Sequence, residues 1–278
     1  MKLRLILLLL IITSGAFANK ELPLWEFGVG AFPLRTDHYR GSPQNKWYTF
    51  PLLAYVYRGE KVEAESGYIR GHIVKSGNLL LDWSFALGLN TNSEENNLRK
   101  GMRDLDPTFE VGPALRYYLW KSQDGDHFIN LEMPYRAVYS SNLKYLEHVG
   151  YYSIPYVNYL SKPATHTLGF AVEASVGIQY GSQGFHNRFY AVSAKDVNPT
   201  RTYFHSVAGY SGTQFSVLLS KRINDFLIMP FLRYDYLDKA VYTDSPLYKN
   251  PNFVMFGMAF IWYFSHSDKK QKAPTMVK

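Results

Sequence analysis

The chain has 278 residues, no cysteine and a formal net charge of +7. The absence of cysteine excludes disulfide bonds, thiolate metal sites and a lipid anchor on an N-terminal cysteine. The basic residues are spread along the chain, with neither a phosphate-binding glycine loop nor a nucleic-acid motif. We therefore expect no cofactor and no nucleic-acid partner.

The first 18 residues have the pattern of a secretory signal peptide. Lys2 and Arg4 precede a short apolar run, Leu5–Ile12, which is too short for an ordinary transmembrane helix. Ala16 and Ala18 form a small-x-small cleavage site, which predicts cleavage directly after residue 18. Without Lys2 and Arg4 the 30 basic residues fall to 28 against 23 acidic ones, a mature charge of +5.

Large apolar and small side chains alternate in residues 253–264. The even positions hold Val254, Phe256, Met258, Phe260, Trp262 and Phe264. The odd positions hold Met255, Gly257, Ala259, Ile261 and Tyr263. Successive side chains of a strand point to opposite faces, so this segment predicts a strand with one large apolar face.

The same alternation recurs in 79–90, 109–119 and 168–180, with charged residues on the smaller-residue face. An amphipathic helix would space its apolar residues three and four apart, which these segments do not. The pattern predicts an all-β protein, a closed antiparallel transmembrane β-barrel with lipid outside and a wet interior. Aromatic residues make up 17% of the chain, as interfacial girdles require. A soluble β-sandwich is the alternative.

We expect about 12 strands joined by short periplasmic turns and longer extracellular loops. Their predicted ranges are 24–33, 47–57, 62–67, 68–76, 79–90, 107–119, 127–139, 149–160, 166–180, 208–221, 226–238 and 252–264. The barrel would occupy residues 19–264, and the longest loop residues 181–207. Residues 265–278 form a basic, polar tail, which we expect to be a solvated, disordered end.

Charged residues of both signs fall on the predicted inner face. They are Asp82, Glu110, Arg116, Glu132, Arg136, Glu173, Arg233 and Asp235. A narrow barrel could hold them in paired ladders across its lumen. One interpretation is a selective pore constriction; the other, which we favour, is that these residues solvate an interior that cannot be wholly apolar.

The sequence shows no catalytic set and no metal site, since its eight histidines lack metal-ligand spacing. One enzymatic alternative is kept, because some barrels of about 12 strands cleave lipids with a Ser–His pair near the outer leaflet. The candidates are Ser206 and Ser211 as nucleophiles, with His205 or His186 as the base. A serine oxygen within about 3 Å of a histidine nitrogen would support this hypothesis.

Short motifs along the whole mature chain resemble those of one known family. In order, they are Phe27–Gly30, Tyr39–Ser42, Phe50–Leu53, Tyr57–Gly59, Gly101–Asp106, Phe109–Gly112, Phe189–Ser193, Ser245–Pro246 and the last strand. In order and spacing they resemble the MipA/OmpV family of outer-membrane proteins. The resemblance implies an outer-membrane barrel of a Gram-negative cell, without assigned catalytic residues. It also implies a scaffold that ties a murein lytic transglycosylase to a murein synthase.

We therefore expect a non-enzymatic barrel that contacts outer-membrane lipid and links the membrane to murein-remodelling enzymes. A small passive channel and a surface-binding, adhesin-like barrel are the alternatives. An outer-membrane lipid hydrolase is the third hypothesis.

Overall fold

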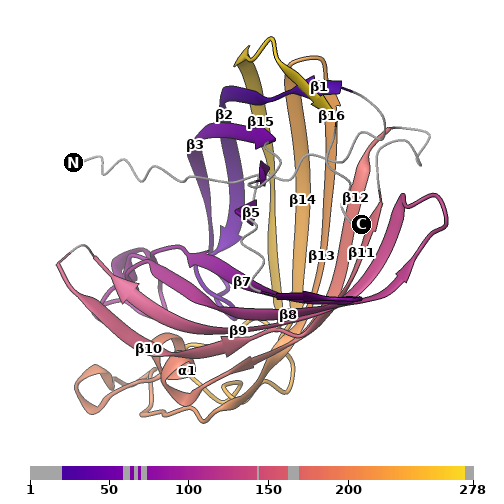
Figure 1. Cartoon of the computed structure of the whole chain (residues 1–278). Helices are drawn as coiled ribbons and strands as arrows, with labels where there is room; N and C mark the ends of the chain where they lie inside the picture. The colour runs from indigo at the N-terminus through magenta and orange to yellow at the C-terminus, as the bar shows by residue number, and fades with distance from the viewer. Residues whose placement is uncertain are drawn as a thin grey trace.

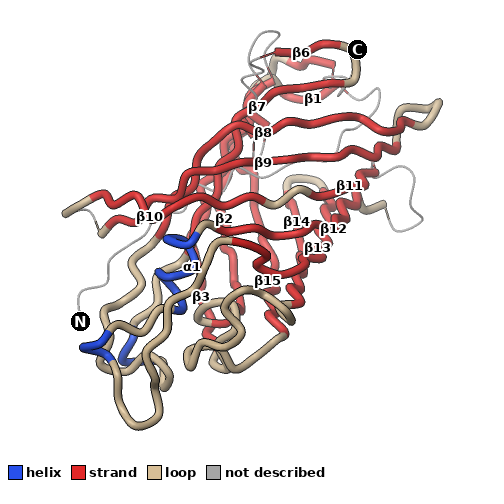
Figure 2. The backbone as a smooth tube through the Cα atoms, turned by 90° about the horizontal axis from the view of Figure 1, so that it is seen from below, coloured by secondary structure: helices blue, strands red, loops and turns tan. Residues whose placement is uncertain are grey.

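The computed structural model describes residues 21–58, 63–65, 68–69, 74–142, 144–161 and 169–272. Nearly all of its regular structure is antiparallel β-strand (Figures 1 and 2). The longer strands are β2 (Trp25–Asp37), β3 (Asn45–Arg58), β7 (Leu79–Gly88), β8 (Thr108–Lys121), β9 (His127–Ser141), β10 (Leu146–Ser153), β11 (Tyr156–Ser161), β12 (Ala171–Gly181), β13 (Gly209–Ile223), β14 (Phe226–Tyr236) and β15 (Asn252–His266). The all-β, antiparallel prediction is confirmed.

The remaining elements are short. The brief strands are β1 (Glu21–Pro23), β4 (Glu63–Glu65), β5 (Tyr68–Ile69), β6 (Val74–Ser76) and β16 (Lys270–Lys272). Helix α1 spans Gln183–Tyr190, and two single 3₁₀ turns span Ser93–Glu95 and Ala194–Asp196. No helix in the described part of the chain is both long enough and apolar enough to span a membrane.

Fourteen strands form one sheet. Its path runs β5-β4-β3-β2-β15-β14-β13-β12-β10-β9-β8-β7-β6, and β11 pairs with β12 and β9. The sheet is strongly curved. In Figure 1, β7, β8 and β9 cross in front of the wall made by β2, β15, β14 and β13. Pairing among the described residues does not join the two ends of the path. The described sheet therefore does not show the predicted closed barrel or the predicted count of 12 strands. The predicted strands 62–67 and 68–76 lie partly outside the described residues.

The faces of the sheet follow the predicted alternation. In β15, Phe256 and Trp262 are exposed on the convex side, whereas Ile261 and Tyr263 are buried on the concave side. In β7, Trp83, Phe85 and Leu87 are exposed, and the intervening residues face inward. β8 and β12 also place large apolar side chains outward and smaller or charged ones inward. The sheet therefore presents a large apolar surface outward, which is the reverse of a soluble sheet.

The segment predicted as one strand over 149–160 is broken in two. β10 ends at Ser153 and β11 begins at Tyr156, with Ile154 and Pro155 between them. Proline has no backbone N–H to donate to a neighbouring strand, which ends regular pairing at this point. The Pro155 carbonyl still accepts from the Ile178 N–H at 3.0 Å, so the chain remains attached to the next strand.

The expectation of a disordered C-terminal tail is wrong for its first part. Lys270–Lys272 form β16 and pair in antiparallel register with Glu21–Pro23 of β1. The Leu24 N–H also donates to the Lys269 carbonyl at 2.8 Å. The two ends of the described chain thus meet in a small ribbon, which Figure 1 shows at the top of the sheet. Residues 273–278 lie outside the described residues.

The long loops fold together at the opposite end of the sheet. Helix α1 begins after Ser182, whose hydroxyl caps the helix by accepting from the Phe185 N–H at 3.4 Å. The residues that pack together here form a loop cluster made of Tyr39, Leu105, Tyr190, Ala240 and Tyr242. These five residues come from four separate loops, so the loop end of the molecule has a core of its own.

Candidate functional site

Ion pairs connect β7, β8 and β9 on the concave face. The Arg116 guanidinium lies between two carboxylates, at 2.7 Å from Glu132 and 3.5 Å from Asp82. Nearer the loops, Arg136 Nε lies 3.0 Å from a carboxylate oxygen of Glu110. All five side chains are largely buried. Adjacent strands supply opposite charges at the same level, so each buried charge is compensated.

The other three predicted inward charges lie on β12 and β14. Arg233 holds the fully buried Asp235 in a two-point contact, with N···O distances of 2.8 and 2.6 Å. Glu173 accepts a hydrogen bond from Asn158 Nδ2 at 3.1 Å. The structure thus places all eight predicted charges on one face but in separate groups rather than one ladder. The cleavage-site residues Ala16 and Ala18 lie outside the described residues.

One buried pair escaped the sequence prediction. Arg222 contacts Glu26 with both terminal nitrogens, one of them at 3.0 Å, and its guanidinium stacks over the Tyr263 ring at 4.5 Å. The sequence does contain a signal for this pair. Glu26, Gly28 and Gly30 alternate along one strand and so lie on the same face, the one with small residues. This pair lies near the end of the sheet that carries the β1–β16 ribbon, here called the ribbon end, and away from the loop cluster.

Part of the concave face is apolar, which the expectation of a wet interior did not foresee. A buried cluster comprises Leu52, Ala54, Val56, Leu227, Met229, Ala259, Ile261 and Tyr263. It is contributed by β3, β14 and β15, whereas the ion pairs come mainly from β7, β8 and β9. The two walls of the curved sheet therefore differ in chemistry, and the polar wall is the one that can hold a ligand by directed contacts.

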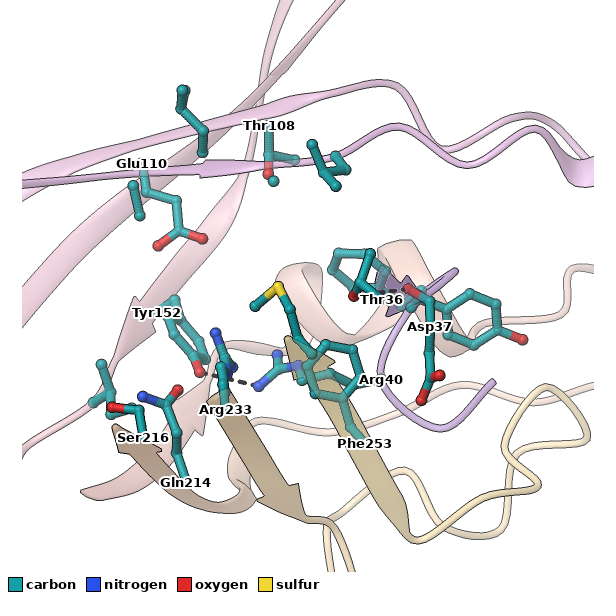
Figure 3. A pocket seen from close by; sticks show the side chains of 18 of the residues that line it. Thr36, Asp37, Arg40, Thr108, Glu110, Tyr152, Gln214, Ser216, Arg233 and Phe253 are labelled. Atoms are coloured by element: carbon teal, nitrogen blue, oxygen red, sulfur yellow. Dashed lines mark hydrogen bonds between the residues drawn. The ribbon is translucent and has the colours of Figure 1, made fainter. Parts of the chain in front are cut away.

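A cavity of about 420 Å³ lies between these walls at the loop end. Its lining includes Glu110, Tyr152, Gln214, Arg233 and Phe253, which Figure 3 shows pointing into the same space. Volumes of a few hundred Å³ are typical of small-molecule sites. Polar groups from opposite walls, together with apolar side chains such as Phe253 and Met255, give this space the composition of a binding cavity.

Arg40, which follows β2 in a loop, is a cavity residue that strand alternation could not predict. Its Nη1 donates to Tyr152 Oη at 3.0 Å and to Gln179 Oε1, and Tyr152 donates to the same amide oxygen at 2.6 Å. The guanidinium also lies 5.1 Å from the Tyr152 ring centroid and 5.6 Å from that of Phe185. Figure 3 shows it beside Arg233, with Glu110 on the strand opposite.

The Tyr39–Ser42 segment fixes the backbone that carries Arg40. Tyr39 donates to the Leu247 carbonyl at 2.7 Å, and the Arg40 carbonyl accepts from Tyr190 Oη at 2.7 Å. Gly41 has a φ of +93°, and a Cβ there would lie 2.5 Å from the Tyr248 ring. The motif therefore needs glycine at this position, and its tyrosine contacts hold the arginine against the cavity.

Buried groups in the loop cluster, and His186 and Arg99 in contact with it, have shifted pKa values. Tyr190 and Tyr242 stack with ring centroids 3.7 Å apart, and burial raises the pKa of Tyr190 well above its usual range. Burial lowers the pKa of His186 to about 4, although its Nδ1 lies 2.7 Å from the Val207 carbonyl. Burial likewise lowers the pKa of Arg99 to about 10. Neutral His186 and tyrosine hydroxyls thus suit this packed environment.

The contact required by the lipid-hydrolase hypothesis is not formed among the described residues. Ser211 Oγ and His186 Nε2 are both buried, and neither has a hydrogen-bond partner. Ser206 Oγ donates to a backbone carbonyl at 3.4 Å, and His205 packs on Tyr203. The same part of the chain contains no group of three histidine, aspartate or glutamate side chains able to hold a metal ion.

An antiparallel sheet with an apolar convex face and a charged concave face is typical of β-sheet outer-membrane proteins. Within that class, the chain belongs to the MipA family, since the family model described as MltA-interacting protein MipA matches residues 28–264. This confirms the resemblance that the sequence motifs indicated. No curated protein matches the chain.

Proposed function

We propose that the chain is an exported outer-membrane β-barrel that acts as a non-enzymatic scaffold for murein-remodelling enzymes. Family membership carries the proposal, because the family is named for interaction with MltA, a murein lytic transglycosylase. A murein synthase would be the second partner. The exposed apolar side chains of β7, β8, β12 and β15 support contact with lipid.

The barrel closes, in this proposal, between β3 and β7. Tyr48 Oη donates to the Asn90 carbonyl at 3.3 Å, and Thr91 Oγ1 donates to the His38 carbonyl at 2.6 Å. Lys46 and Glu95 form an ion pair across the same gap. β3 begins and β7 ends at these contacts, so the two strands run antiparallel, as closure of this sheet requires.

The ribbon end supports docking of a periplasmic partner. It carries the paired segments Glu21–Pro23 and Lys270–Lys272 and the short turns at residues 122–126 and 224–225. The loop cluster occupies the opposite end, which faces the cell exterior in a barrel with short periplasmic turns. A murein enzyme anchored in the periplasm would therefore meet the ribbon end.

A pull-down with purified proteins tests the scaffold. The full chain in detergent is expected to retain a murein lytic transglycosylase, and deletion of residues 267–278 is expected to abolish retention. The matched control is Lys195→Glu at the loop end, which should leave retention unchanged. Equal retention by all three proteins would place docking elsewhere, and no retention by the full chain would refute the scaffold.

A passive channel is the second candidate, favoured by the cavity and its paired charges. Planar-bilayer recording of the purified chain separates the two functions. Steady ion-selective conductance, altered by Arg136→Ala or Glu173→Ala, would support the channel. An adhesin-like role of the loop end would instead show as binding to host-surface molecules without conductance.

A further inference from the structure

Arg40 is a cavity-lining cation without a carboxylate partner among the described residues. It lies in no ion pair within 4.0 Å, and the acceptors it reaches, Tyr152 Oη and Gln179 Oε1, are neutral. Only Nη1 makes these bonds, so Nε and Nη2 have no acceptor in the described structure. A guanidinium offers five N–H donors and remains charged at any physiological pH.

The other two arginines of the cavity are already neutralised. Arg136 contacts Glu110 at 3.0 Å, and Arg233 holds Asp235 through two hydrogen bonds. Removing a charge from water without a counter-charge is costly, so a buried cation normally has an ionic partner. Arg40 contacts two aromatic rings, the Tyr152 hydroxyl and one amide instead. The Asp235 carboxylate also favours the charge of Arg40, but it is already bound by Arg233, so one carboxylate serves two cations.

The arginine is also held in place before any ligand arrives. Its carbonyl accepts from Tyr190, and the carbonyl of the next residue, Gly41, accepts from the N–H groups of Lys249 and Asn250 at 2.8 and 3.1 Å. Ser42 Oγ accepts from Asn96 Nδ2 at 3.0 Å. Three other loops thus hold the segment that carries Arg40, and a backbone fixed in advance lowers the entropy cost of binding.

The rest of the cavity wall suits hydrogen-bond donors on the ligand. Ser175 and Ser216 hydroxyls lie 2.7 Å apart on the wall, and Gln214 lies beside them (Figure 3). The carboxylates of Glu110 and Glu173 also line the cavity. A purely anionic ligand would meet these carboxylates unfavourably, whereas hydroxyl groups would donate to them.

We propose that this cavity binds a small hydroxylated organic acid, whose anionic group pairs with Arg40 and whose hydroxyl groups contact Ser175 and Ser216 on one wall and Glu110 on the opposite wall. The cavity of about 420 Å³ accommodates a ligand of this kind. The proposal is independent of docking at the ribbon end, because the two sites lie at opposite ends of the sheet.

Isothermal titration of the purified full chain in detergent tests the site, with gluconate as probe and glucose as its uncharged analogue. Gluconate is expected to bind and glucose to bind far more weakly. Arg40→Gln is expected to weaken gluconate binding about ten-fold or more, since it removes a charge-assisted contact. Lys100→Gln, which removes an exposed cation of the loop end, is the matched control and should bind as the native chain does.

Ser216→Phe provides a second variant, because it fills the cavity without changing Arg40 or its supports. Loss of gluconate binding here would support the site even if Arg40→Gln fails to fold. Equal binding of gluconate and glucose, unchanged binding in Arg40→Gln or Ser216→Phe, or no binding by the native chain would overturn the proposal. Inorganic phosphate that binds as tightly as gluconate would also overturn it, in favour of a simple anion site.

Discussion

Buried arginines on the concave face, such as Arg116 and Arg233, lie beside side chains of the opposite charge. Arg116 contacts Glu132 and Asp82 from two neighbouring strands, and Arg233 contacts Asp235 two positions along the same strand. Such pairs add little net stability over apolar residues of equal volume. Removal of one partner, however, leaves the other charge buried without a counter-charge, which is strongly destabilising. Single substitutions should therefore be far more damaging here than at the surface.

Replacement of Arg116 by methionine tests this asymmetry. The carboxylates of Glu132 and Asp82 would lose their shared cation, and we expect a loss of about 3–5 kcal/mol in the free energy of unfolding. The matched control is Lys46→Met, which removes the half-exposed pair with Glu95 and should cost less than about 1 kcal/mol. Urea unfolding in detergent, followed by tryptophan fluorescence, measures both; equal losses would contradict the argument.

His186 should make the loop cluster sensitive to acid. Its pKa is lowered to about 4 in the folded chain, against 6.5 for an ordinary histidine, so the unfolded chain binds a proton first as pH falls. The stabilising contribution is complete above pH 6.5 and is lost as pH falls toward 4. Between pH 7 and 5 this loss amounts to about 2 kcal/mol.

The variant His186→Asn isolates that contribution, because an amide can replace the hydrogen bond to the Val207 carbonyl without titrating. We expect the unfolding free energy of the variant to fall less than that of the native chain between pH 7 and 5. Parallel pH profiles for the two proteins would show that His186 is not the responsible group.

At the scale of elements, strand positions were predictable where one face is apolar and the other small. β7, β8, β12 and β15 all lie within a few residues of their predicted ranges, because alternation is set locally by side-chain direction. The break between β10 and β11, the helix α1 and the pairing of β16 were not predicted. The break at Pro155 had a local signal, whereas β16 depends on a partner strand about 250 residues away.

Arginine substitutions on adjacent residues of β12 test which face meets lipid. Val176 is exposed on the convex side, and Val176→Arg should cost roughly 2–4 kcal/mol in a bilayer. Ser175 faces the cavity, so Ser175→Arg should be milder. Reversible unfolding in liposomes compares the two, and equal costs at both positions would contradict the assignment of faces.

At the scale of the whole molecule, the sequence pattern predicted the charges on the strands but not Arg40, a loop residue that also lines the cavity. The inward charges of β7, β8, β9, β12 and β14 alternate along each strand together with small residues. Their common face could therefore be predicted from the sequence. Arg40 lies in a loop, where no periodicity assigns a direction. Its position depends on contacts with residues 150 or more positions away, such as Tyr190 and Leu247 near Tyr39 and Arg40. Tertiary contacts of this kind are invisible to local patterns.

Closure of the sheet has a direct signature in the amide groups of β7. In the described sheet β6 pairs only with Leu79–Leu81, so the alternate N–H groups of residues 83–88 that point away from β8 have no strand partner there. A membrane offers no water to satisfy such groups, and a strand in lipid must pair on both sides. If β3 closes onto β7, these amides should exchange hydrogen as slowly as those that face β8, with the exposed turn at residues 122–126 as a fast-exchanging control. Rapid exchange confined to the β8-distal amides in lipid bilayers would show that the sheet stays open between β3 and β7.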